Sequence, residues 1–395
     1  GLLAALTATR ARPSHRVVVL DRLPGPGAKL AATGGGRGNL SHAASEEEFA
    51  ASFGKHGRFT LPAFRSLPPE ALRQFFAEIG IPTIVDETGR IYPRSQSAPA
   101  MRDALVHAGQ RAGVQFVFNH RVETLTPPAH PDAPWRVDTF SAQAVLLAAG
   151  GASAPRLGSD GSGFALARSL GYTITPPVPA LTSIRTEETW PGTLSGISLP
   201  DVVLSIAGAR GPNQSARGEL LFTRHGLSGP AVLNLSGRIA RLRHDGHPVV
   251  LHLRLLPNPL DIPRLRQTAG TRRVLTELTP CLPRALVSTV LDLSGIPPDL
   301  TFSRLSSPQE KALIAHLSAC PLHVQATSGF DESMATAGGI ALKQIHPDTL
   351  EGRLTPRLYF AGEILDLDGP TGGWNLQWAF CSGHLAAHAV LSRQP

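Results

Sequence analysis

The chain has 395 residues, of which 42% are hydrophobic and 17% are charged, a composition typical of a soluble globular protein with two or three domains. It has no apolar run of the roughly 18 residues that a membrane span needs, and its three cysteines are spaced too widely for a zinc motif or a disulfide framework, which favours reduced thiols in a cytoplasmic protein. The net charge of +7 comes mostly from arginine, and without interleaved aromatic residues it favours a solvated basic surface over a nucleic-acid interface.

The start of the chain has the pattern of half a dinucleotide-binding unit. Residues 1–12 are apolar at helical spacing, and residues 16–21 form a β-branched run that ends in an acid. A helix that begins at a glycine, followed about 20 residues later by a strand ending in an acid, is the second half of such a βαβ unit. Gly1 is then the last glycine of the GxGxxG turn, and Asp21 accepts hydrogen bonds from a ribose.

The first strand of that unit and its first two glycines are not in the sequence. Such a strand normally lies in the middle of the parallel sheet, and its loss exposes the edges of both neighbouring strands. Three alternatives stay open. The sequence lacks residues of the natural protein, or the chain is a damaged gene product that cannot hold its cofactor, or Gly1 opens an ordinary amphipathic helix.

A glycine-rich stretch, KLAATGGGRGN, occupies residues 29–39. Three consecutive glycines fit poorly in a helix or a strand and indicate close approach of the backbone to a flat ligand. A merely flexible loop is the alternative. The candidate binding residues here are Lys29, Thr33, Gly34, Gly35, Gly36, Arg37 and Asn39.

The following residues alternate between helical and strand patterns up to a proline-rich stop at residues 176–179. A capping box is predicted at Ser45 and Glu48. Helices are predicted at 69–79, 98–112 and 162–170, a hairpin at 83–92, and strands at 114–124, 135–140 and 144–149. Residues 148–151 resemble the ATGG turn that follows this strand in many flavoproteins, with Ala149 in place of the threonine. That resemblance implies close approach of the backbone to a dinucleotide, so Ala148, Gly150 and Gly151 are candidates.

From residue 181 to 256 the pattern changes to short apolar runs separated by Gly and Pro, which predicts a small antiparallel sheet or barrel. Residues 231–236, AVLNLS, are one of the predicted strands. Arg224, His225 and Ser228 occur here, but their spacing indicates no Ser/His/acid triad, so nucleophilic hydrolysis is not favoured. Helices are predicted between 261 and 317, and strands return at 322–326 and 334–340.

Residues 358–387 combine a short apolar strand, a turn rich in Gly, Asp and Pro, and an apolar helix. Unpaired amides at such a helix start can hold an anionic or polar cofactor. An ordinary βα turn is the alternative, but polar side chains between buried flanks need partners. The candidates are Gly362, Glu363, Asp366, Gly372, Gly373, Asn375 and Leu376.

The last segment resembles the C-terminal signature of FAD-binding flavoproteins of the aminoacetone oxidase family, also called BaiN-like, which runs YFAGE, D-x-DGPTGG and an aromatic residue before NLQWAF. Three further stretches are similar to the family in the same order: residues 29–39, LGSDGSG at 157–163 and GELLFTRHGLSGPAVLNLS at 218–236. The resemblance spans nearly the whole chain.

The resemblance implies an α/β fold with a discontinuous, glutathione-reductase-like Rossmann domain that binds FAD. This domain comprises residues 1–180 and 346–395, an inserted antiparallel β domain comprises 181–256 and 322–345, and a helical insert comprises 257–321. It also implies that the glycine loop passes near the flavin, that the backbone around Val122 contacts adenine, and that Glu363 lies by the ribitol or pyrophosphate. A capping or salt-bridged acid is the alternative for Glu363. The amides that begin the last helix would lie near N1 and O2 of the ring.

Two positions depart from the family. Gly38 stands where a cysteine is usual, which removes thiol chemistry there. Arg224 stands where a histidine is usual, and His225, one place later on a strand, faces the other way, so a histidine role does not carry over.

We therefore expect a cytoplasmic FAD-dependent oxidoreductase that passes a hydride between NAD(P)H and a small organic substrate, with no metal. No second GxGxxG is present, so reduction by the substrate itself is equally allowed. The family names suggest aminoacetone oxidation or bile-acid reduction, but no residue pattern identifies the substrate, the catalytic residues or the oligomeric state. A nucleic-acid-associated flavoprotein, similar to tRNA-modifying enzymes, and a remnant that cannot bind FAD are the alternatives.

Overall fold

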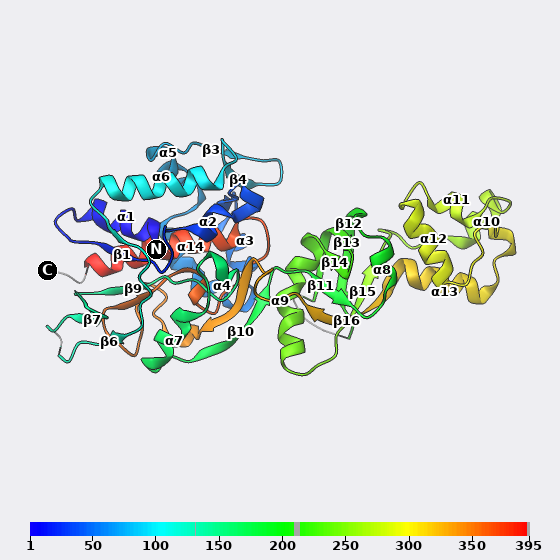
Figure 1. Ribbon diagram of the computed structural model, residues 1–395. Coiled ribbons are helices and arrows are strands. Elements are labelled where there is room, and N and C mark those ends of the chain that lie inside the picture. Colours follow the sequence, from blue (N-terminus) through cyan, green and yellow to red (C-terminus); the bar gives the residue numbers. More distant parts are fainter. Residues whose placement is uncertain (131, 209–213, 393–395) are drawn as a thin grey trace. The chain divides into compact units, whose positions relative to one another are not determined.

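The computed structural model describes residues 1–130, 132–208 and 214–392. The chain forms two compact units, one from Gly1–Val178 with Ser333–Pro395 and the other from Pro179–Glu332 (Figure 1). In the described part of the chain, no helix is long and apolar enough to cross a membrane.

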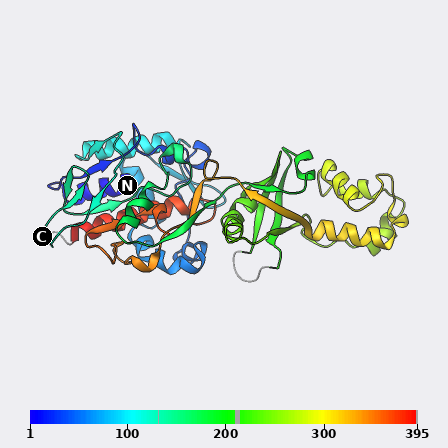
Figure 2. The same ribbon diagram turned by 60° about the horizontal axis from the view of Figure 1, so that its bottom comes forward.

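The first unit is a Rossmann-type α/β domain in which short parallel strands lie among helices (Figures 1 and 2). β1 (Val18–Leu20) pairs with β5 (Gln115–Val117), and β9 (Val145–Leu147) pairs with β18 (Leu358–Phe360). β18 is completely buried, as expected for a parallel strand covered on both faces. Because β9 and β18 lie more than 200 residues apart in the chain, their pairing joins the two segments of this unit.

Helices cover these strands, and the side chains of Ser45 and Ser97 cap the helices that follow them. The capping box of Ser45 and Glu48 is confirmed at the start of α3. The helices of the unit are α1 (Leu2–Ala11), α2 (Ala28–Ala31), α3 (Glu46–Ser52), α4 (Gly57–Ser66), α5 (Pro69–Glu78), α6 (Ala98–Arg111), α7 (Ser162–Ser169) and α14 (Trp374–Ser392). The other strands are β2 (Ser41–His42), β3 (Thr83–Val85), β4 (Arg90–Pro93), β6 (Leu125–Thr126), β7 (Trp135–Val137), β8 (Phe140–Ala142), β10 (Ile174–Ala180) and β17 (Ala335–Ile340).

Two expectations for this unit are wrong. The strand predicted at 114–124 ends at Val117, and Asn119 adopts a positive φ of 53°, so Val122 lies in a loop. Residues 333–345, expected in the β domain, lie in the first unit because β17 pairs with β10 and Ile340 forms a bridge with Leu365.

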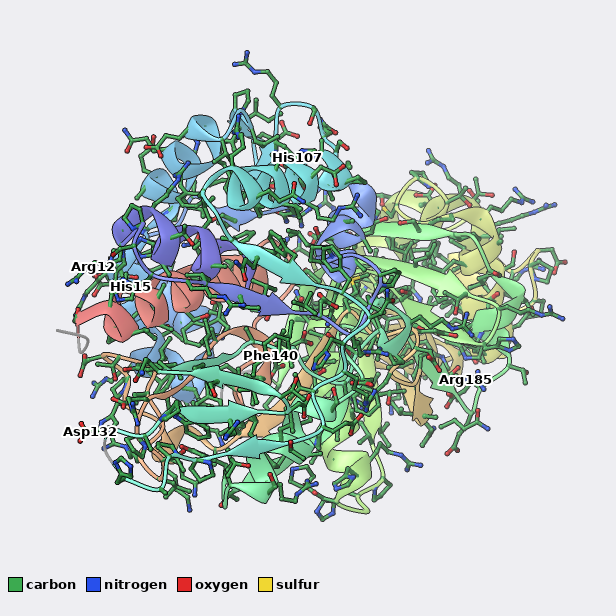
Figure 3. All side chains as sticks on the ribbon, turned by 60° about the vertical axis from the view of Figure 1, so that its left-hand side comes forward. Arg12, His15, His107, Asp132, Phe140 and Arg185 are labelled. Atoms are coloured by element: carbon green, nitrogen blue, oxygen red, sulfur yellow. The ribbon has the colours of Figure 1, made fainter. Side chains whose placement is uncertain are left out.

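The second unit contains a closed antiparallel barrel, which is the second of the two predicted forms, a sheet or a barrel. Its strand order is β11 (Ile184–Thr186), β14 (Gly226–Ser228), β13 (Ser215–Thr223), β12 (Ser198–Ile206), β15 (Val250–Arg254) and β16 (Cys320–Thr327). The predicted helices follow as α10 (Ile262–Ala269), α11 (Val274–Leu278), α12 (Arg284–Leu293) and α13 (Ser307–Ala319). Arg185 of β11 is exposed at the surface of this unit (Figure 3).

The strand predicted at AVLNLS is wrong, because these residues lie in helix α9 (Pro230–His244). Proline at the first helical position favours this start. The buried positions Ala231, Leu235 and Ile239 recur every four residues and continue past the end of the predicted run, which places one helical stripe in the core.

Candidate functional site

Four separate segments of the first unit meet at the carboxylate of Glu363, which lies in the short 3-10 turn after β18. Its Oε2 accepts a hydrogen bond of 2.5 Å from Lys29 Nζ. Its Oε1 accepts from Ser153 Oγ at 2.8 Å and from the amide of Thr336 at 2.7 Å. Lys29 also donates to Ser153 Oγ at 2.6 Å. The Lys29 and Glu363 side chains are 25% and 22% exposed, so this network is shielded but reaches the surface.

Gly151 makes this network possible. A Cβ at that position would lie 2.3 Å from Thr336 Oγ1 and 3.2 Å from the Glu363 carboxyl carbon. Thr336 Oγ1 accepts from the amides of Ala152 and Ser153 at 2.9 and 3.0 Å, which ties the turn after β9 to β17. Lys29, Gly151 and Glu363, all predicted from the sequence, thus lie together. Ser153 and Thr336 were missed, and the only local signal was a small hydroxyl residue beside each glycine-rich run.

The glycine loop presents bare backbone. Gly34 approaches the chain so closely that a Cβ would lie 2.9 Å from the amide nitrogen of Asn39. Gly35 and Gly36 have positive φ values of 64° and 87°, and a Cβ on either would have no heavy atom within 4 Å. This backbone is therefore open to solvent, and nothing blocks the close approach of a ligand to it.

Asn39 joins this loop to the start of α14. With its amide oriented to satisfy its neighbours, the Asn39 oxygen accepts from the Gly373 amide at 3.1 Å and its nitrogen donates to the Ser41 carbonyl at 2.9 Å. A Cβ on Gly373, whose φ is 99°, would lie 2.3 Å from that carbonyl oxygen. The Gly373 amide is therefore already hydrogen-bonded to Asn39. The lack of a side chain at Gly373 lets the start of α14 pack against the Ser41 carbonyl.

The first turn of α14 contributes backbone N–H groups that can donate hydrogen bonds to a ligand. The Asn375 side chain exchanges hydrogen bonds of 2.8 Å with the backbone of Gly369, which holds the preceding loop. The amides of Trp374, Asn375 and Leu376 have no intrahelical acceptor, as at the start of any helix. They carry the positive end of a 19-residue helix dipole.

Asp21 follows β1 and lies half-buried. Its Oδ1 accepts from the amide of Leu23 at 2.9 Å. Burial raises the pKa of the Asp21 carboxyl, although the Leu23 amide and the Arg22 charge oppose that shift. Arg22 donates to the carbonyls of Gly158 and Pro155, so it ties the end of β1 to the loop before α7.

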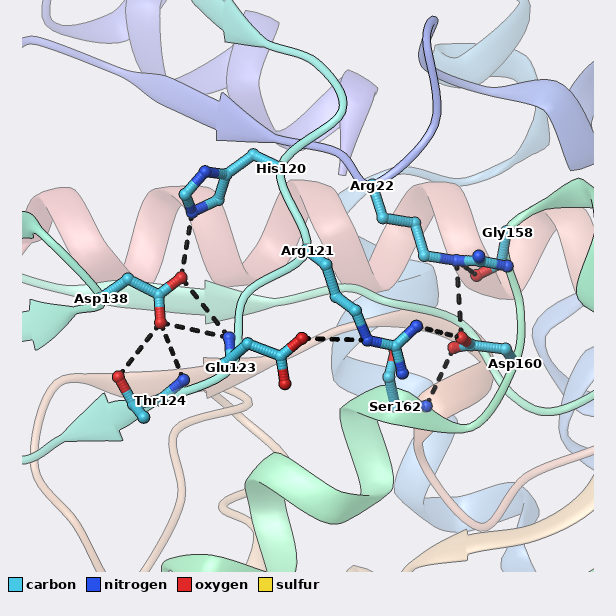
Figure 4. Close-up of polar contacts among 9 residues, drawn as sticks. All are labelled: Arg22, His120, Arg121, Glu123, Thr124, Asp138, Gly158, Asp160 and Ser162. Atoms are coloured by element: carbon cyan, nitrogen blue, oxygen red, sulfur yellow. Dashed lines mark hydrogen bonds and ion pairs between the residues drawn. The ribbon is translucent and has the colours of Figure 1, made fainter.

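A polar network fixes the loop that contains Val122 (Figure 4). His120 Nε2 lies 2.9 Å from Asp138, which also accepts from the backbone amide of Thr124 at 2.8 Å. Arg121 donates to Asp160 at 2.7 Å, and Asp160 accepts from the amide of Ser162 at 3.0 Å. The loop is therefore held in place without being a strand.

The hydrogen bonds and ion pairs of Asp160 make the stability of the protein depend on pH. Burial opposes its charged form, but the Ser162 hydrogen bonds, Arg121 and Arg22 together lower the pKa from 3.8 to about 2. The contribution of the ionised Asp160 carboxylate to the free energy of unfolding is therefore complete above about pH 4 and is lost as the pH falls through 2. We expect Asp160→Asn to lower the free energy of unfolding by about 1–2 kcal/mol at pH 7, after allowing for solvent screening, with a much smaller difference near pH 2.

Urea unfolding at both pH values measures this effect. Asp132→Asn is the matched control, because Asp132 is exposed (Figure 3) and should show no such pH-dependent loss. Equal losses at pH 7 and pH 2 for Asp160→Asn would contradict the prediction.

The other predicted residues lie around these groups. A Cβ on Gly1 would be 3.8 Å from the Ala148 methyl, and one on Gly150 would be 2.5 Å from Ser159 Oγ. Thr33 donates to the Leu30 carbonyl at 2.7 Å and so serves the end of α2. The Arg37 guanidinium lies 5.0 Å from the Tyr92 ring centroid, and Gly372 is half-buried. The amide of Gly362 donates to Ser382 Oγ, and the amide of Asp366 donates to the Ile340 carbonyl. In the second unit, Arg224 and His225 are both exposed at the tip of the β13–β14 hairpin.

Comparison with known families and proteins gives a match over almost the whole chain. The description "HI0933-like protein Rossmann domain" matches residues 1–389. The sequence is 32% identical over 402 residues to the 3-dehydro-bile acid delta(4,6)-reductase of Clostridium scindens, covering 100% of this chain and 97% of that protein. It is 27% identical over 399 residues to the ribosomal RNA dihydrouridine synthase of Escherichia coli, covering 98% and 94%.

Solved structures share the fold at low sequence identity. The Escherichia coli quinol fumarate reductase subunit aligns with a TM-score of 0.51 and 15% identity, covering 99% of this chain and 68% of that one. The 3-ketosteroid delta1-dehydrogenase of Sterolibacterium denitrificans aligns with a TM-score of 0.50 and 14% identity, covering 100% and 98%.

Proposed function

The chain belongs to the HI0933-like Rossmann family of flavoprotein oxidoreductases, and on that premise we propose that it binds FAD and passes a hydride between NAD(P)H and a small organic substrate. The observation that carries this proposal is the meeting of Lys29, Gly151 and Glu363 in the unit that also joins the glycine loop to the start of α14. When bound, FAD supplies the two-electron chemistry.

The residues present fit this cofactor. The open backbone at Gly35 and Gly36 suits a flat ring, and the free amides of α14 suit the side of the ring that becomes anionic on reduction. The cluster of Lys29, Ser153 and Glu363 offers donors and acceptors to a polyol or diphosphate chain. Asp21 would hold the ribose, as the βαβ pattern implies.

We further propose that the substrate carries a carbon–carbon double bond conjugated to a carbonyl. One relative is named for reducing a 3-dehydro-bile acid and another for making dihydrouridine in ribosomal RNA. An unsaturated ketone and a uracil ring share this conjugated unit. Reduction then adds a hydride to the β carbon and a proton to the α carbon. NAD(P)H supplies the hydride and leaves as NAD(P)+, and water supplies the proton.

The visible absorption spectrum of the purified chain tests this function. We expect flavin bands after incubation with FAD and removal of free cofactor, and we expect these bands to bleach on addition of NADPH or NADH under nitrogen. Reoxidation by an unsaturated ketone would then identify the substrate class. If no flavin remains bound, the proposal fails. If flavin binds but neither nucleotide bleaches it, the donor is wrong and the substrate itself becomes the candidate donor.

A second candidate is reduction of uridine in ribosomal RNA. The Escherichia coli dihydrouridine synthase is similar to this chain over nearly its whole length, and α9 ends in Arg241, Arg243 and His244. Retention of ribosomal RNA that falls steeply with salt, together with dihydrouridine formation by the reduced protein, would favour it over a small-molecule substrate.

A further inference from the structure

We infer that His42, which no motif singles out, is a positioning residue for the flavin-facing end of α14. It would act through the single peptide bond that joins Gly372 to Gly373. This inference rests on the proposed binding of FAD and adds a residue whose role is to fix the direction of the donors.

This peptide is held from both ends. The Gly372 carbonyl oxygen lies 3.2 Å from His42 Nδ1, so the imidazole must carry its proton on Nδ1 to donate. The Gly373 amide donates at 3.1 Å to Asn39. His42 and Asn39 come from one short segment, which β2 anchors by pairing Ser41 with Ile91 and His42 with Arg90.

A Gly–Gly peptide needs such a clamp. Gly372 and Gly373 have φ values of 118° and 99°, in the region that glycine enters freely, so the peptide plane between them can flip at little cost. A flip would exchange the carbonyl and the amide and would break both hydrogen bonds. The next carbonyl, that of Gly373, accepts the first helical bond from the Gln377 amide at 3.0 Å, so the clamped peptide directly precedes the first turn of α14 and its free amides.

The imidazole is itself held in place. Its ring stacks on the Trp374 indole with centroids 4.6 Å apart and an interplanar angle of 17°. On another side, a Cβ at Gly89 would lie 2.9 Å from His42 Nε2, so the turn between β3 and β4 packs closely against the ring. His42 therefore makes two separable contacts, a stack on Trp374 and a hydrogen bond to Gly372.

Two variants separate these contacts. His42→Phe keeps a ring over Trp374 but loses the donor, whereas His42→Asn keeps a donor near the Nδ1 position and loses the stack. Both are compared with the wild type and with His107→Phe, an exposed histidine on α6 in the same unit (Figure 3). Each protein is loaded with FAD, and the midpoint potential of the bound flavin is measured. Hydrogen exchange of the peptide that covers residues 366–376 is followed without FAD.

We expect His42→Phe to weaken the binding of reduced flavin relative to oxidised flavin about tenfold. For a two-electron couple this makes the midpoint potential of the bound flavin about 30 mV more negative. Exchange in residues 366–376 should become at least tenfold faster. His42→Asn should stay near the wild type in both measurements, as should His107→Phe. Asn39→Ala releases the other end of the same peptide and should shift both measurements in the same direction as His42→Phe. It replaces His42→Phe as the test if that variant does not fold.

Three results would overturn the inference. Wild-type potential and exchange in His42→Phe would show that the peptide needs no clamp, and an equal shift in His42→Asn would assign the effect to the stack. A wild-type chain that takes up no FAD would defeat the proposed function and this role with it. Exchange of the FAD-free protein would still show whether His42 holds the peptide, so the two failures are distinguishable.

Discussion

Replacement of Gly373 with alanine is expected to lower the free energy of unfolding by about 2–4 kcal/mol and to weaken FAD retention more than tenfold. The positive φ of 99° costs an alanine about 1 kcal/mol, and a methyl group 2.3 Å from the Ser41 carbonyl oxygen forces a backbone shift that costs about 1–3 kcal/mol more. The same shift separates Gly373 from Asn39 and so opens the junction between the glycine loop and α14. Urea unfolding and flavin content after desalting measure the two effects.

Gly80→Ala is the matched control for this variant. Gly80 belongs to the same unit and has a similar φ of 86°, but a Cβ there would meet no atom within 4 Å. We expect a loss of only about 1 kcal/mol and unchanged flavin content. Equal destabilisation by the two substitutions would mean that the close contact with Ser41 has no cost and that the junction is not rigid.

Glu363→Ala is expected to destabilise the first unit by about 2–3 kcal/mol and to abolish stable retention of FAD. The substitution leaves the Lys29 ammonium without its carboxylate and the Thr336 amide without its acceptor. Losing one partner of a buried ion pair typically costs more, but these side chains are about a quarter exposed, which reduces the penalty. Glu363→Gln, which keeps one acceptor oxygen, should fall between alanine and the wild type.

An exposed pair provides the comparison for Glu363. Glu46 contacts Arg65 at the surface of the same unit, and Glu46→Gln should leave both stability and flavin content unchanged. A double-mutant cycle with Lys29→Met then isolates the coupling between Lys29 and Glu363. Normal flavin content in Glu363→Ala would remove this cluster from the proposed cofactor site.

Recognition of the family from the sequence is confirmed, because its motifs are local runs whose chemistry does not depend on distant residues. The capping box at Ser45 and the apolar helix after Gly373 were readable for the same reason. The short strands predicted a small antiparallel sheet or barrel, and the closure into a barrel comes from the tertiary structure, which pairs β11 with β16. Periodicity was misleading at AVLNLS, because six apolar and polar residues in alternation fit a strand while the longer run to His244 fits a helix. The substrate and the electron donor remain proposals.

The sequence by itself determined where the backbone must be bare and where a capped helix such as α3 begins, since glycine runs and caps act through neighbouring residues. Only the tertiary structure decided which groups meet. Glu363 pairs with Lys29, which lies 334 positions away in the sequence. His42 contacts Gly372, which lies 330 positions away. Such partners depend on the pairing of β9 with β18 and on where each loop closes, and no spacing in the chain encodes them. The cofactor-binding pattern is therefore local, whereas the clamps that would hold it rigid are a property of the fold.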